Sequence, residues 1–88
     1  MNYPTIAISD ILNKIKQTSY FVLPDTTVTI CNILLENGFS VRGESACVSP
    51  ENFNKALGEK YAFEDAVNKI WSLEGYLLKQ KLWEQSNA

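Results

Sequence analysis

The chain has no histidine, and its one arginine is Arg42. Without histidine it lacks the commonest general base and the commonest zinc ligand. Ten acidic against eight basic residues give a net charge of −2, which disfavours a general nucleic-acid binder, because such proteins rely on a basic face. A Walker loop, a glycine fingerprint and a metal-ligand cluster are also missing. We therefore predict a protein with no catalytic residues, metal or cofactor, and consider nucleic acid an unfavoured partner.

Cysteine is scarce, with Cys31 and Cys47 only. This pair does not suit a zinc site, and we expect both to be reduced, mostly buried thiols. No run approaches the ~20 apolar residues that a membrane-spanning helix needs, and Met1–Pro4 lacks the features of a signal peptide. We expect a cytoplasmic protein with no membrane partner.

The apolar spacing predicts an α+β fold in a single domain, residues 1–88, with loose ends at 1–7 and 84–88. A long C-terminal helix should cover one face of a three-stranded antiparallel sheet. The elements we expect are a short helix at about 9–17, a strand at 19–23, paired strands at 26–35 and 39–48, and a helix that begins at Ser49-Pro50-Glu51.

Asn37-Gly38 predicts a hairpin, because a type I′ turn needs positive φ at both central positions. With a two-residue loop, the numbers of opposed residues sum to 75, although a three-residue loop would shift this pairing. The two-residue register puts Arg42 and Glu44 on a half-covered or partner-contacting face. It predicts a core face that pairs Val28 with Cys47, Ile30 with Ser45, Asn32 with Gly43 and Leu34 with Val41.

The long helix carries one apolar stripe from Phe53 to Leu77, and we expect a bend or break near Ser72–Gly75. More large apolar side chains surround this helix than one small sheet can bury. The surplus favours a homo-oligomer, although aromatic residues near a helix end can also simply close the core. The predicted interface residues are Trp71, Tyr76 and Trp83.

Arg42 is the sharpest polar candidate, since a guanidinium can hold a phosphate or carboxylate with two hydrogen bonds. The competing interpretation is an exposed ion pair with Glu44 on the same face. An anion clamp at a subunit boundary would add Lys60, and an adjacent ring such as Tyr61 or Trp71 could stack on a base. The predicted ligand-binding residues are Arg42, Glu44, Lys60 and Tyr61.

A set of residues spread over most of the chain carries a similarity to known proteins: Tyr20, Cys31, Asn37-Gly38-Phe39, Gly43 to Cys47, Ser49 to Phe53, Gly58, Ala62, Ala66, Trp71 and Leu73 to Leu78. With these residues the chain resembles, from Ile8 to Leu82, a family of small tailed-phage proteins, the gp forty-nine/gp sixty-six family. Ser72 departs from the proline expected in many relatives. The resemblance implies a phage or prophage accessory gene, expressed in the cytoplasm of an infected bacterial host, and it supplies no activity.

Three functions follow from these observations. The leading hypothesis is a non-catalytic, oligomeric phage protein that counters host defence by sequestering a small anionic, nucleotide-type signal. The alternative is a direct inhibitor of a host or defence protein, and the second alternative is a weak nucleic-acid binder. Small phage accessory proteins commonly act against host defences, and this association alone assigns no site.

Overall fold

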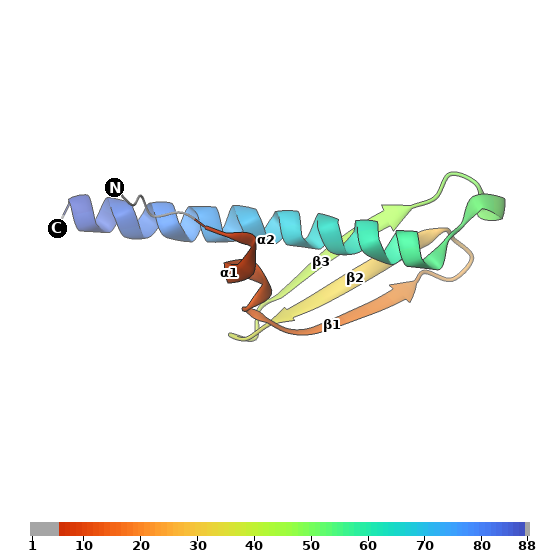
Figure 1. The fold of residues 1–88 in the computed structure, drawn as a ribbon, viewed down its shortest axis with the longest axis horizontal. Coiled ribbons are helices and arrows are strands. Elements are labelled where there is room, and N and C mark those ends of the chain that lie inside the picture. The colour runs from red at the N-terminus through yellow and green to blue at the C-terminus, as the bar shows by residue number, and fades with distance from the viewer. Residues whose placement is uncertain (1–5, 88) are drawn as a thin grey trace.

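The computed structural model describes residues 6–87. Three antiparallel strands form a sheet in the order β1–β2–β3, and the long helix α2 lies across one face of it (Figure 1). No other described segment covers the opposite face, so the fold is α+β with two layers, as predicted. The elements are α1 (Ile8–Leu12), β1 (Ile15–Val22), β2 (Val28–Leu35), β3 (Ser40–Ala46), a 3₁₀ turn η1 (Pro50–Asn52) and α2 (Lys55–Ser86).

α2 is much longer than the sheet that it covers. Its 32 residues span about 48 Å, whereas the eight residues of β2 span about 27 Å. The helix therefore runs past the sheet at its C-terminal end (Figure 1). The radius of gyration is 16.3 Å, with extents of 57 × 26 × 19 Å, against the ~12 Å expected of a compact domain of this length.

The N-terminal helix is shorter than predicted. The spacing of Ile11 and Ile15 favours a helix to residue 17, but α1 ends at Leu12 and β1 begins at Ile15. Ile15 pairs with Leu35 across the sheet, with a bulge between Ile15 and Gln17. Ladder pairing with β2 outweighs the helical pattern, because an isolated helix of two turns is unstable.

The hairpin has a three-residue loop rather than the predicted two-residue one. Of the loop residues 36–38, only Gly38 has positive φ, at +92°, and the Leu35 N–H donates to the Phe39 carbonyl at 2.8 Å. Opposed residues therefore sum to 74, so that Arg42 faces Asn32. The predicted type I′ register was wrong by one residue, because a type I′ turn would also require positive φ at Asn37.

This shift exchanges the two faces of β2. Its buried side chains are the odd-numbered residues and not the even-numbered set predicted as core. On β3 the predicted inward set is correct from Val41 to Ser45. The core consists of Ile11, Cys31, Ile33, Leu35, Val41, Ala62, Ala66, Val67 and Ile70.

We call the uncovered side of the sheet the outer face. Its side chains alternate with the buried ones along each strand. All of them are exposed or half-buried, and they include both polar and apolar groups. The outer-face residues are Gln17, Ser19, Phe21, Val28, Ile30, Asn32, Leu34, Ser40, Arg42, Glu44 and Ala46.

α2 packs against β3 at unusually short range. A Cβ atom added to Gly43 would lie 2.2 Å from the Ala62 carbonyl oxygen and 2.3 Å from the Ala66 nitrogen. Ala62 and Ala66 are fully buried. The small residues on both elements therefore set the distance between helix and sheet.

The start of α2 also differs from the prediction. Ser49-Pro50-Glu51 leads into η1, whereas Asn54 caps α2 and accepts a hydrogen bond from the Leu57 N–H at 3.1 Å. An extended residue, Phe53, separates the two helical segments. The proline pattern marks a helical turn correctly, but the cap that begins the long helix comes five residues later.

The predicted bend near Ser72–Gly75 does not occur, because α2 is continuous from Lys55 to Ser86. Serine at 72 leaves its backbone N–H available to the helix, which a proline would not. The helix includes most of the predicted loose C-terminal end. Of the predicted loose N-terminal arm, residues 1–5 lie outside the described residues, and Ile6 packs against the core.

Candidate functional site

Arg42 projects from the outer face of β3. Its Nη1 atom donates to Asn32 Oδ1 at 3.3 Å and to Ser40 Oγ at 3.1 Å. Between residues 6 and 87 the ion pairs are Lys14–Glu74 and Lys69–Asp65, so the nearby Glu44 does not neutralise Arg42. Its guanidinium stands exposed and unpaired, as an anion clamp requires.

Two α2 side chains close the free edge of β3. Lys69 Nζ donates to the Arg42 carbonyl at 2.7 Å, and the Glu44 N–H donates to Asp65 Oδ2 at 2.9 Å. Lys69 and Asp65 are also 3.7 Å apart as an i,i+4 pair. These bonds occupy two of the outward backbone groups that the edge strand would otherwise leave open.

Lys60 and Tyr61 lie together on α2. Lys60 Nζ is 5.8 Å from the centre of the Tyr61 ring, within the range of a cation–π interaction. Tyr61 is half-exposed and lines a cavity of about 230 Å³. This cavity lies between the end of β3 and the start of α2, and its other lining residues include Phe53, Asn52 and Asn54.

One chain does not bring the four predicted ligand-binding residues together. Arg42 and Glu44 are on the outer face, whereas Lys60 and Tyr61 belong to the helix layer on the other side of the sheet. A single pocket with all four would need a second subunit.

The predicted interface residues have different surroundings. Trp71 is half-buried and packs against the core. Tyr76 is 72% exposed and Trp83 is 55% exposed. The last buried residue of α2 is Ile70, and we call residues 76–86 the projecting segment.

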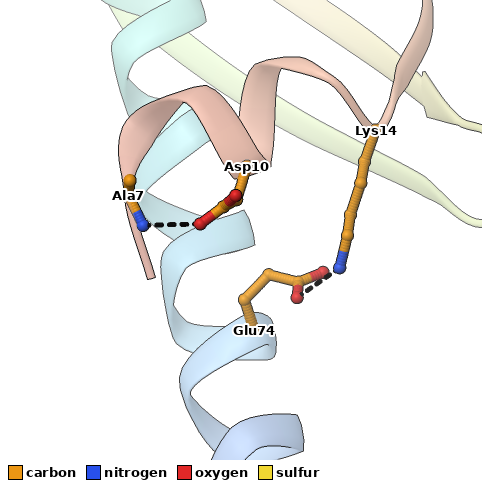
Figure 2. Close-up of polar contacts among 4 residues, drawn as sticks. All are labelled: Ala7, Asp10, Lys14 and Glu74. Atoms are coloured by element: carbon orange, nitrogen blue, oxygen red, sulfur yellow. Dashed lines mark hydrogen bonds and ion pairs between the residues drawn. The ribbon is translucent and has the colours of Figure 1, made fainter. Parts of the chain in front are cut away.

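A cavity of about 460 Å³ lies between α1, the hairpin and α2. Beside it, Lys14 Nζ and Glu74 Oε2 form an ion pair at 2.6 Å, and the Ala7 N–H donates to Asp10 Oδ2 at 2.8 Å (Figure 2). The charged residues that line the cavity are Asp10, Lys14, Glu36, Glu74 and Lys81. Three carboxylates against two ammonium groups make it a poor anion site.

Sequence reasoning missed this cavity, because its residues come from segments some sixty positions apart. The one available signal is Glu74, a carboxylate next to the apolar stripe of α2. Its half-buried side chain is matched by Lys14, and this ion pair fastens the start of β1 to the helix.

The two cysteines are free. Cys31 is fully buried and Cys47 is half-buried. Burial raises the pKa of the Cys31 thiol, and burial together with the neighbouring Cys31 raises the pKa of Tyr20. A buried thiol with a raised pKa is a poor nucleophile.

Two further findings concern the described part of the chain as a whole. No group of three or more carboxylate or thiol side chains is placed to hold a metal ion. None of its helices is long and apolar enough to cross a membrane.

Residues 6–82 match a family of known proteins. The chain belongs to the phage protein (N4 Gp49/phage Sf6 gene 66) family. The match spans both layers of the fold, from Ile6 on the core to most of α2, and it identifies a small phage protein. No curated protein and no solved structure matches the chain.

Proposed function

We propose that this phage protein is a non-catalytic homo-oligomer that counters host defence by binding its target. The observation that supports this function is the projecting segment of α2. It extends past the sheet (Figure 1) and presents Tyr76 and Trp83 to solvent. A helical segment of this length is marginal in water without packing, and exposed aromatic residues are typical of interface hot spots.

A second copy of the chain is the partner that fits the projecting segment best. Two such segments packed side by side would bury the same apolar residues on both copies, which is the arrangement of a twofold interface. The small core of an 88-residue chain would gain stability from this burial.

The subunit count tests this interface. We expect native mass spectrometry to give more than one subunit, and the double variant Tyr76→Ala/Trp83→Ala to lower that number. Phe39→Ala is the matched control, because Phe39 is an exposed aromatic residue (56%) on the hairpin, away from α2's end. A single-chain mass for the unaltered protein at tens of micromolar would refute the proposal.

The first candidate target is a small anionic, nucleotide-type signal. Three observations favour it: the unpaired guanidinium of Arg42, the ammonium of Lys60 over the Tyr61 ring, and the cavity that Tyr61 shares with Phe53. Cations suit phosphates and rings suit bases. Because one chain holds these groups on opposite sides of the sheet, the proposed pocket lies at a subunit boundary.

To test this target, the protein is incubated with a pool of host nucleotides, and native mass spectrometry then shows whether a nucleotide stays bound. Arg42→Ala and Lys60→Ala should each remove the retained ligand, whereas Lys79→Ala, which changes an exposed lysine of the projecting segment, should not. If the unaltered oligomer retains no nucleotide, sequestration is excluded.

The second candidate target is a host or defence protein, bound through the outer face. Between residues 6 and 87 no segment covers that face, on which the exposed Phe21 (50%) pairs with the half-buried Ile30, and on which Leu34 is also half-buried. Arg42→Ala separates the two candidates, because it should abolish nucleotide binding and leave inhibition of a protein nearly intact. A weak nucleic-acid binder would instead show a steep salt dependence in a DNA titration, and a flat signal would remove that alternative.

A further inference from the structure

The two edges of the sheet differ in how their backbone groups are satisfied. Along β3, the side chains of Asp65 and Lys69 bond to the outward-pointing N–H of Glu44 and carbonyl of Arg42. Along β1 no described segment lies beside the strand (Figure 1). Unpaired edges are templates for strand addition, and β1 is the edge that residues 6–87 leave open.

The register identifies which backbone groups of β1 are free. The Leu23 N–H donates to the Val28 carbonyl at 3.0 Å, and residues of an antiparallel pair face their partner strand alternately. Odd-numbered residues of β1 therefore bond to β2. The N–H and C=O groups of Thr18, Tyr20 and Val22 point away from the sheet.

Lys16, at the bulge, is the one charged residue of this edge strand. From Gln17 to Leu23 the chain has no charged residue, proline or glycine. Tyr20, Phe21 and Val22 are between 38% and 50% exposed. Open edges usually carry charges, prolines or bulges that block pairing, and the one bulge lies at the start of the strand, between Ile15 and Gln17. An eight-residue edge with so little protection is suited to being covered.

We propose that β1 pairs antiparallel with β1 of a second copy, joining the two sheets into one of six strands. A twofold axis at Tyr20 places Thr18 of each copy opposite Val22 of the other. This register uses the outward N–H and C=O groups of all three residues in both copies. In this register Lys16 of each copy falls opposite Pro24 of the other, so no like charges face each other across the new pairing.

Closure of the other edge determines the size of this assembly. Because Asp65 and Lys69 bond the outward N–H of Glu44 and the outward carbonyl of Arg42 in the middle of β3, a further strand cannot pair there without displacing them, and we expect strand addition to end after two copies instead of continuing into a fibre. The twofold axis keeps both α2 helices on one side and doubles the outer face. This interface is separate from the projecting segment, so either one can fail without the other.

The test uses the full chain with the projecting segment disabled by Tyr76→Ala/Trp83→Ala. In this background we expect native mass spectrometry to show dimers. Ser19→Glu places like charges near the axis, and Thr18→Pro removes an outward N–H that β2 does not use. Each should halve the mass while circular dichroism stays unchanged. Ala46→Glu, which adds the same charge to the exposed outer face of β3, should leave the dimer intact.

Amide hydrogen exchange gives an independent measurement. In the dimer, the outward N–H groups of Thr18, Tyr20 and Val22 should exchange as slowly as the inward N–H groups of β1, and in the Ser19→Glu variant they should exchange rapidly. A single-chain mass in the disabled background overturns the proposal. So do rapid exchange at these three amides in the unaltered dimer, and a folded Thr18→Pro protein that remains dimeric.

Discussion

Gly43→Ala should destabilise this protein strongly, although alanine is normally the better residue within a strand. The added methyl group would lie 2.2 Å from the Ala62 carbonyl oxygen and 2.3 Å from the Ala66 nitrogen. Both are backbone atoms of α2, so no side chain can rotate away. To reach an ordinary contact of 3.4 Å, the helix must move outward by about 1.2 Å, the difference between 3.4 and 2.2 Å.

The magnitude follows from two opposing effects. Overpacking of a dense core costs about 1–3 kcal/mol, and contacts with backbone at this range belong at the upper end. The lower conformational entropy of unfolded alanine offsets about 0.4–1 kcal/mol. A displaced α2 would also strain the hydrogen bonds of Lys69 and Asp65 to β3. We expect a net loss of about 2–3 kcal/mol, which corresponds to a fall of roughly 10–20 °C in Tm for a domain of this size.

Urea unfolding monitored by circular dichroism measures this loss, and a thermal scan at fixed protein concentration checks it. The midpoint should fall with little change in slope. A Gly43→Ala protein within about 0.5 kcal/mol of the unaltered chain would refute the reasoning, because the helix would then tolerate a wider separation from the sheet.

Three further changes test other parts of the fold. Gly75→Ala is the matched control for Gly43→Ala, because a Cβ at Gly75 meets nothing within 4 Å. The Gly75→Ala substitution should raise the free energy of unfolding in urea by roughly 0.5–1 kcal/mol, and a lower free energy of unfolding would contradict this expectation. Glu74→Gln breaks the ion pair with Lys14, which should cost about 0.5–1 kcal/mol and reduce the sensitivity of stability to added salt, although the Lys69–Asp65 pair remains; an unchanged salt dependence would count against a contribution from the Lys14–Glu74 pair. Because burial raises the pKa of Cys31 above 9.0 in the folded chain, the unfolded chain loses that proton first. The free energy of unfolding should therefore be highest below about pH 9 and fall as the pH rises further, and Cys31→Ala should fall less steeply; parallel pH profiles would show that Cys31 contributes nothing.

Short sequence patterns correctly predicted the elements that depend on a few neighbouring residues. Gly38 marks the hairpin, Pro50 marks a helical turn, and the apolar stripe of α2 gives one long helix over the sheet. Membership of the phage family was also evident from the sequence, and residues 6–82 match it. Arg42 and Glu44 were placed correctly on the non-core face of β3, because alternation along a strand is independent of its pairing.

The buried face of β2 could not be settled by its own residues. Val28 to Leu35 is apolar on both faces, so either set of alternating side chains could form the core. The loop length decides between them, and one residue of slip turns every side chain of the strand to the other side. The change from helix to strand at Ile15 could not be predicted from the local sequence either, because it depends on the pairing of Ile15 in β1 with Leu35 in β2.

The sequence by itself determined the hairpin, the long helix, the lack of histidine chemistry and the phage family. Only the tertiary structure decided which face of β2 is core, how closely Gly43 approaches α2, and which sheet edge is closed. The physical reason is the same in each case. Composition and periodicity report on the conformation of a few neighbouring residues. The contact of Gly43 with Ala62 and the hydrogen bond from Lys69 to the Arg42 carbonyl instead connect β3 with α2, and these segments meet only when the helix packs on the sheet.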